Sequence, residues 1–265
     1  MSSVTIGVST LTVEPLKHCL QQKYSLIEEC DQGSFTFFEL KTPGLVTQLL
    51  ARVIIDELQI KWLQRLLQTH YSYFDQEEQL LIIEHTKPDL QRKAQENFQY
   101  MCQGLRDYLA VHNHLVVEGF IRFRMKAYWA FLRDTLDKAV DAYLMDQEYQ
   151  EFIKLLRYFV ELQEPKIGMV NVILHTNGDF KLMDNESNII HTEYLEGIIL
   201  EIGNNELDFE DLLISALITV APSQIILHLH SDNHATQTIL SIFDERVTLC
   251  AGCAICYDVE KTTES

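Results

Sequence analysis

The spacing of apolar residues changes once along this chain, at Gln163-Glu164-Pro165, and this change constrains the fold more than any other feature. Between residues 45 and 163 apolar residues recur every three to four positions, which is the period of an amphipathic helix. After Pro165 short β-branched runs alternate with turn signals, and Asn177-Gly178 predicts a hairpin between two of them. We therefore expect a helical region followed by a separate domain that contains a sheet.

The first 44 residues have the pattern of a small α/β unit. Residues 4–8, 25–30 and 35–40 are strand-like, and Glu14-Pro15 starts a short helix because proline is accepted in a first turn. A unit with so few strands is marginal by itself. We therefore consider that it completes the sheet of the C-terminal domain.

Residues 45–164 are predicted to be helical. Asp75 followed by Glu78 is a capping-box signature, and His85-Thr86-Lys87-Pro88 is expected to end the helix that starts there. Aromatic residues at helical spacing between 128 and 160 are interpreted as core packing. The short stretch 112–118 is interpreted as a surface turn between helices.

Residues 165–265 are predicted to form a mixed-sheet α/β domain that ends in a Cys-x2-Cys-x2-Cys run. A strand over 224–229, a helix over 234–243 and a strand over 246–249 suggest a short parallel crossover. Residues 194–202 have features of both helix and strand. The whole chain is thus predicted to be α+β, with a small α/β unit over 1–44, a helical middle over 45–164 and this domain over 165–265.

The net charge of −18 is uneven, because residues 165–265 carry four Lys/Arg and sixteen Asp/Glu. Such an acidic surface argues against nucleic acid and anionic lipid as partners. The basic stretch Arg122-Phe123-Arg124-Met125-Lys126 is too short for a nucleic-acid patch and is interpreted as a solvated helix face. We also expect no membrane insertion, no secretory leader, a cytoplasmic location and reduced cysteines.

Three of the six cysteines, Cys250, Cys253 and Cys256, lie within seven residues. Thiolates at this spacing converge on one ion only if the backbone curls, and the small residues between them permit that curl. With His228 as a fourth ligand from a neighbouring strand, they would form a zinc site. The sequence therefore predicts a metal site at these four residues.

Three alternatives remain for the cysteines. An iron–sulfur cluster would need a fourth ligand from a histidine, Cys102, Cys19 or Cys30, since position 260 is glutamate rather than cysteine. The spacing of Cys250 and Cys253 also suits thiol redox chemistry, although no helix follows that would lower a thiol pKa. Finally, the three cysteines could simply pack as small apolar residues at the end of a buried strand.

Further histidines lie close to this region. His230 would share a strand face with His228, and His234 would follow in the first turn of a helix, with Asp232 between them. Two histidines on one face can chelate a metal, but histidines at a strand end more often make structural hydrogen bonds. Asp232 is interpreted as a helix cap or as a partner of a ligand.

Several strings in combination resemble one known family. They are Phe123-Arg124-Met125-Lys126-Ala127-Tyr128, the helical segment from Tyr149 to Lys166, the run from Glu210 to Pro222, Ile225-Ile226-Leu227-His228, and Arg246-Val247 with Leu249-Cys250-Ala251-Gly252-Cys253. Over residues 95–256 the chain resembles the YtxC family, sporulation proteins of endospore-forming bacteria. The resemblance implies a cytoplasmic, sporulation-associated protein of undefined activity. It supplies no catalytic residues.

The sequence contains no nucleophile elbow, phosphate-binding glycine loop, dinucleotide fingerprint or His-Glu-x-x-His motif. We therefore expect a protein that is not an enzyme and that holds a structural or regulatory metal. The first alternative is a scaffold or adaptor without cofactor, which binds a protein partner through its helical and acidic surfaces. The second is a thiol redox protein.

Overall fold

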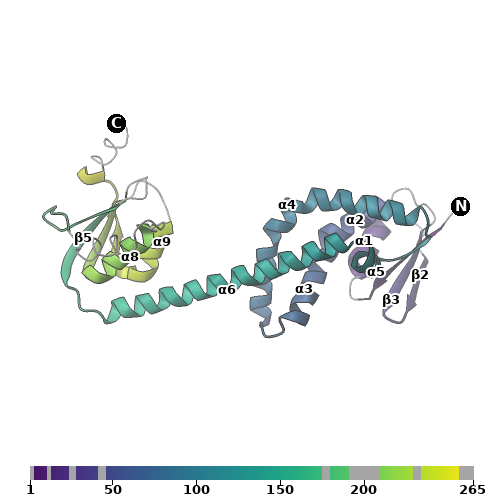
Figure 1. Ribbon diagram of the computed structural model, residues 1–265, viewed down its shortest axis with the longest axis horizontal. Coiled ribbons are helices and arrows are strands. Elements are labelled where there is room, and N and C mark those ends of the chain that lie inside the picture. Colours follow the sequence, from purple (N-terminus) through teal and green to yellow (C-terminus); the bar gives the residue numbers. More distant parts are fainter. Residues whose placement is uncertain are drawn as a thin grey trace. The chain divides into compact units, whose positions relative to one another are not determined.

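A computed structural model describes residues 3–10, 13–23, 28–40, 46–174, 180–190, 209–228 and 234–256. The chain forms two compact units, Met1–Asp146 and Gln147–Ser265, and each combines helices with a four-stranded sheet (Figure 1). This confirms the predicted α+β class. The predicted division into 1–44, 45–164 and 165–265 stays a prediction. The ambiguous stretch 194–202 lies outside the described residues.

The first unit begins with strands and one helix and continues with helices. Its elements are β1 (Val4–Ser9), α1 (Val13–Lys23), β2 (Glu28–Gln32), β3 (Phe35–Leu40), α2 (Val46–Val53), a π-helical turn (Ile54–Leu58), α3 (Gln59–His70), α4 (Gln76–Leu109), β4 (His114–Val116), α5 (Val117–Arg124) and the first part of α6 (Lys126–Leu162). The predicted capping box is confirmed, because the Asp75 carboxylate accepts the Glu78 N–H and the Glu78 carboxylate accepts the Asp75 N–H.

The N-terminal strands form their own sheet, in the order β2-β3-β1-β4, and do not extend the C-terminal one. Strand β4 pairs parallel with β1, so the prediction of a surface turn over 112–118 is wrong. Three residues are too few to show strand periodicity, and only the long-range pairing with β1 defines them. Leu115 is buried against the unit's core, which includes Ile6 and Phe38.

Helix α4 runs through Pro88, so the prediction that Pro88 ends it is also wrong. Proline lacks the N–H that would bond to the carbonyl four residues earlier. The helix nevertheless continues because Ile82, Ile83, Thr86 and Leu90, on both sides of Pro88, are buried. Burial of one face therefore outweighs the local cost of proline.

Replacing exposed Pro88 by alanine should raise the free energy of unfolding of the first unit by about 1–3 kcal/mol, because a helical N–H is restored and no packing is lost. Both tryptophans, Trp62 and Trp129, lie in this unit, so urea unfolding followed by tryptophan fluorescence reports on it. Lys87→Ala, at the neighbouring exposed position, should change stability by less than about 0.5 kcal/mol. A destabilised Pro88→Ala protein would show that the packing requires the proline.

The second unit contains the C-terminal part of α6 and a four-stranded sheet. Its elements after α6 are β5 (Ile167–Leu174), β6 (Phe180–Met183), α8 (Phe209–Val220), β7 (Pro222–His228), α9 (His234–Phe243), a 3-10 turn (Asp244–Arg246) and β8 (Val247–Leu249). The sheet order is β6-β5-β7-β8, with β5, β7 and β8 parallel and β6 antiparallel to β5. The antiparallel pairing of β5 with β6 confirms the strands of the predicted hairpin, whose Asn177-Gly178 turn lies outside the described residues. The parallel pairing of β7 with β8 confirms the predicted crossover through α9.

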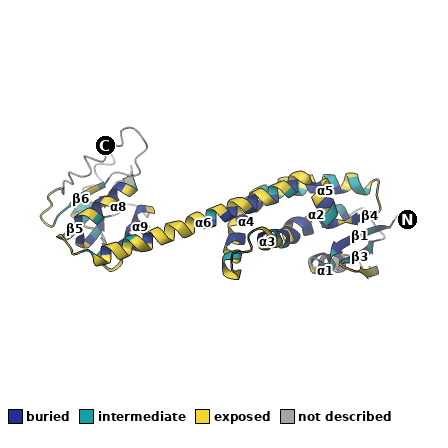
Figure 2. Cartoon of the chain, turned by 60° about the horizontal axis from the view of Figure 1, so that its bottom comes forward, coloured by how far each residue is buried: buried dark blue, intermediate teal, exposed yellow. Residues whose placement is uncertain are grey.

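Helices α6, α8 and α9 pack on this sheet through a core that includes Ile153, Leu217, Ile225 and Ile239. The interpretation of the α6 aromatics as core residues holds only for the earlier half of the helix, where Tyr128 and Tyr143 are buried. From residue 149 onward most positions are exposed (Figure 2). Among the described helices, none is long and apolar enough to cross a bilayer.

Candidate metal centre

The parallel sheet places His228 and Cys250 side by side. Strands β7 and β8 run in the same direction, and Leu227 pairs with Leu249, so both strands end at the same edge. His228 is the last residue of β7, and Cys250 directly follows β8. The Cys250 N–H donates to the carbonyl of Leu227 at 2.9 Å, which extends the ladder by one more bond.

Beyond Cys250 the backbone turns back toward His228. Gly252 has φ of +115°, a conformation that residues with a side chain rarely adopt. Residues 254–256 are helical, and this turn returns Cys256 to the edge of the sheet. The curl expected from the small residues is therefore present, and glycine at position 252 makes it possible.

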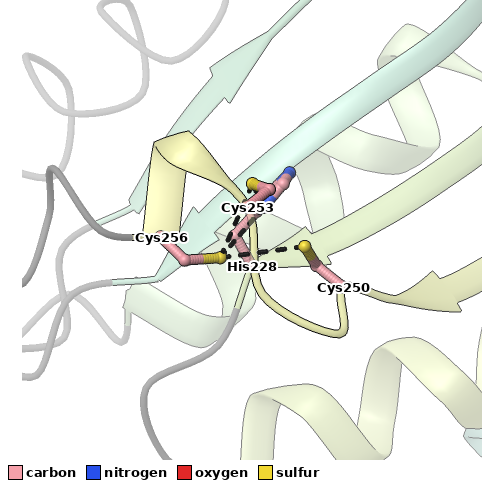
Figure 3. A group of neighbouring side chains, drawn as sticks. All are labelled: His228, Cys250, Cys253 and Cys256. Carbon is pink, nitrogen blue, oxygen red and sulfur yellow. Dashed lines mark hydrogen bonds between the residues drawn. The ribbon is translucent and has the colours of Figure 1, made fainter.

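The three sulfur atoms and one ring nitrogen lie around a common centre (Figure 3). The Sγ atom of Cys256 lies 3.8 Å from those of Cys250 and Cys253. The Nδ1 atom of His228 lies 3.4 Å from the Sγ atoms of Cys253 and Cys256. All four ligand atoms lie within 4.8 Å of one another, and the residues could hold a metal ion such as zinc.

The two S–S distances of 3.8 Å and the two S–N distances of 3.4 Å are close to those around a single tetrahedral ion. With Zn–S of about 2.3 Å and Zn–N of about 2.0–2.1 Å, tetrahedral ligands lie about 3.8 Å apart for two sulfurs and about 3.6 Å for sulfur and nitrogen. An iron–sulfur cluster distributes its thiolates over separate iron atoms, which requires a wider spacing. Simple packing does not describe the site either, because Cys253 is exposed and Cys250 and Cys256 are half-buried.

Asn171 holds the His228 ring in the orientation that a metal ligand needs. The Asn171 Nδ2 group donates to the carbonyl of Asp184 at 3.3 Å, so Oδ1 is the atom that faces the imidazole. This Oδ1 lies 3.0 Å from Nε2 of His228 and can only accept, so Nε2 carries the proton. The lone pair of Nδ1 then points at the thiols. Such an outer hydrogen bond fixes the tautomer and ring orientation of metal-binding histidines.

A tight turn after β6 holds the Asp184 carbonyl that accepts the hydrogen bond from Asn171. The Asp184 carboxylate accepts the backbone N–H groups of Glu186 and Asn188 at 2.8 and 2.9 Å. The hydrogen bonds from the backbone and side chain of Asn188 lower the pKa of Asp184. The carbonyl that orients Asn171 therefore belongs to a residue that Glu186 and Asn188 hold in place by hydrogen bonds.

Comparison with known proteins assigns the chain to a family. The model of the YtxC-like family matches residues 44–248. The chain belongs to the YtxC-like family. It is 26% identical over 195 residues to the uncharacterized protein YtxC of Bacillus subtilis (strain 168), and the alignment covers 69% of this chain and 68% of that protein. No solved structure matches.

The match to the YtxC-like family includes His228 but ends before Cys250. The metal centre is therefore supported by the geometry of this chain and not by family membership. Asn171 also lies within the match. The sequence does not indicate a role for Asn171, because an asparagine in a β-strand shows no function until the residues of the neighbouring strand are known.

Among the described residues, none of the other candidate ligands belongs to the four-residue group. His234 Nδ1 lies 2.9 Å from a carboxylate oxygen of Glu210, and His234 is outside the four-residue group. His230 and Asp232 lie outside the described residues, as does the side chain of Cys19. Cys30 and Cys102 belong to the first unit.

The acid–base properties of the four groups also suit a metal. Burial lowers the pKa of His228, so the ring is neutral near pH 7. The backbone N–H of Cys256 lowers the pKa of the Cys253 thiol, whereas burial raises that of Cys256 to about 11. Without a metal, the Cys256 thiol therefore keeps its proton at neutral pH, and a metal ion must displace it.

Zinc binding should accordingly release about two to three protons per ion near pH 7, since each ligating thiol binds as a thiolate. Because protons compete with the metal, zinc affinity should rise with pH and fall on acidification. Titration of the metal-free protein with zinc in weakly buffered solution, with a pH indicator, measures the release. Zinc binding without proton release would contradict ligation by the thiols.

Proposed function

We propose that this protein is a cytoplasmic, sporulation-associated member of the YtxC-like family that binds one zinc ion through Cys250, Cys253, Cys256 and His228. The single observation that supports zinc most strongly is the convergence of three sulfurs and one nitrogen within 4.8 Å of one another. The sporulation setting and the cytoplasmic location follow from the family resemblance of the sequence.

The proposed role of the metal is structural or regulatory. Four protein ligands complete a tetrahedral shell, and catalytic zinc sites instead keep one position open for water or substrate. The segment that zinc would fix is weakly held otherwise. Strand β8 has only three residues, and Leu249 at its end is 51% exposed. A metal that joins β7 to the curl after β8 would stabilise this edge of the sheet.

The biological part of the proposal is tested by complementation in an endospore-forming host whose own family member is deleted. The wild-type chain should restore sporulation, and a fluorescent fusion should be found in the cytoplasm. The triple variant Cys250→Ser/Cys253→Ser/Cys256→Ser should fail, whereas Cys30→Ser should restore sporulation. Normal sporulation with the triple variant would contradict a required metal.

A second candidate function is the adaptor, and the surface of α6 favours it. In the second unit the side chains of Phe152, Leu155, Tyr158, Phe159 and Leu162 are between 52 and 67% exposed. Adjacent exposed apolar side chains of this kind are typical of protein–protein contacts. A protein partner could bind there whether or not the metal is present.

The same complementation assay distinguishes the zinc-dependent function from the adaptor function. If the adaptor function depends on this surface, Leu155→Glu/Tyr158→Glu should lose sporulation although the purified variant keeps its metal. A variant that sporulates normally would exclude this α6 surface as a required contact. Arg157, which pairs with Glu161 and Asp244, should be left unchanged because it supports the fold of the unit.

A further inference from the structure

A cavity of about 500 Å3 in the first unit is lined by residues from three helices. Trp62 and Arg65 belong to α3, Arg122 to α5, and Trp129 and Arg133 to α6. Residues three or four positions apart share one face of a helix, so each helix contributes a short stripe of side chains. Each of the three stripes includes one arginine.

None of the three arginines forms an ion pair with a residue that the structure describes. The guanidinium groups of Arg65, Arg122 and Arg133 make no ion pair or hydrogen bond with described residues, whereas Arg92 and Arg157 pair with carboxylates. This is unexpected in a chain with 39 Asp and Glu and 21 Lys and Arg. Three unpaired cations around one cavity create a positive potential that favours an anion.

Two indole rings form the apolar part of the same cavity. The rings of Trp62 and Trp129 meet edge to face, with centroids 6.3 Å apart. Trp62 is 6% exposed, and its Nε1–H has no acceptor among the described residues. Glu118 is the one carboxylate among the lining residues, and its Oε1 accepts the N–H of Ser9 at 2.9 Å.

We propose that this cavity binds a nucleoside triphosphate, with the guanidinium groups on the phosphates and the base against the tryptophans. Arginine presents a planar fork that matches phosphate oxygens, and three such groups suit a polyphosphate better than a single carboxylate. Indole rings pack well on flat aromatic bases. The volume lies within the range of small-molecule sites, roughly 300–1,000 Å3.

A nucleic acid fits these observations less well. Proteins that bind nucleic acid present basic residues along an extended groove or patch, and this chain gathers three arginines at one cavity and has a net charge of −18. The rest of the surface would repel a polyanion longer than the cavity. The cavity is in the first unit, so the proposal is independent of the metal centre in the second.

The test uses the intrinsic fluorescence of the full-length protein, because the chain has two tryptophans and both line the cavity. ATP should change the emission in a saturable manner. Arg65→Gln and Arg133→Gln should each weaken binding by about tenfold or more, the value of one lost charge-assisted contact. Arg124→Gln is the matched control, because it removes an exposed arginine of α5 that does not line this cavity.

Four results would overturn the proposal. The first is no saturable change in tryptophan emission with ATP, and the second is an equal loss of ATP affinity in Arg124→Gln and Arg133→Gln. The third is inorganic tripolyphosphate that binds as tightly as ATP. The fourth is a single-stranded oligonucleotide that binds more tightly than ATP and depends on the same arginines. The third would show that the base is not recognised. The last would identify a nucleic-acid surface instead. Far-ultraviolet circular dichroism of each variant checks that the fold is retained.

Discussion

Replacing Cys256 by serine should lower the affinity for zinc about a hundredfold to a thousandfold. Structural zinc sites with four ligands bind with apparent free energies of about 10–16 kcal/mol, so one ligand contributes roughly a quarter of that value. Cys256 contacts Cys250, Cys253 and His228, so its loss removes the central member of the group. Competition with a chromophoric chelator measures the affinity.

Compared with the wild type, Cys256→Ser should make the second unit less stable in the presence of zinc. The two proteins should be equally stable in the presence of a chelator. Because zinc binds the folded state, the wild-type protein should show a higher Tm with zinc, and Cys256→Ser should lose this shift. Cys30→Ser is the matched control, since Cys30 is an exposed cysteine of the first unit. Equal zinc affinities for Cys30→Ser and Cys256→Ser would contradict the assignment of Cys256 as a ligand.

Replacing Asn171 by leucine should weaken zinc binding by about tenfold to a hundredfold, the usual effect of losing the partner that orients a metal-binding histidine. Leucine has a similar size but cannot accept the His228 Nε2–H, so the ring loses its fixed tautomer and orientation. The measurement is the same chelator competition, together with the stability of the metal-free variant.

The variant Asn171→Asp distinguishes the effect of Asn171 on the orientation of His228 from its effect on the stability of the fold. Aspartate keeps an acceptor for Nε2–H, so zinc affinity should return to within a few-fold of the wild-type value. It loses the donor to the Asp184 carbonyl, so the metal-free protein should be less stable than wild type by about 1 kcal/mol. If the leucine and aspartate variants bound zinc equally weakly, loss of the hydrogen bond to His228 would not explain the weaker binding of Asn171→Leu.

Much of this site could be predicted from the sequence because its parts obey local rules. Three cysteines at a constant spacing indicate a common centre, and a helix between two short strands predicts a parallel crossover. Parallel strands end at one edge, which brings His228 next to Cys250. The role of Gly252 also followed from residue type.

What the sequence could not provide depends on contacts between distant segments. Asn171 acquires a role only because β5 lies next to β7, and three-residue β4 is a strand only because β1 pairs with it. The continuation of α4 through Pro88 depends on the burial of residues on both sides of the proline, and the local sequence does not show this burial. The arginines of the first-unit cavity come from three helices, and no single stretch of sequence contains them.

Binding of one zinc by three thiolates and one imidazole can be measured by metal analysis and zinc X-ray absorption of protein purified without oxygen. We expect one equivalent of zinc, with sulfur at about 2.3 Å and nitrogen at about 2.0–2.1 Å in a ratio of three to one, and loss of the metal in the triple Cys→Ser variant. Iron with visible absorption, or protein without metal that takes up no added zinc, would contradict it.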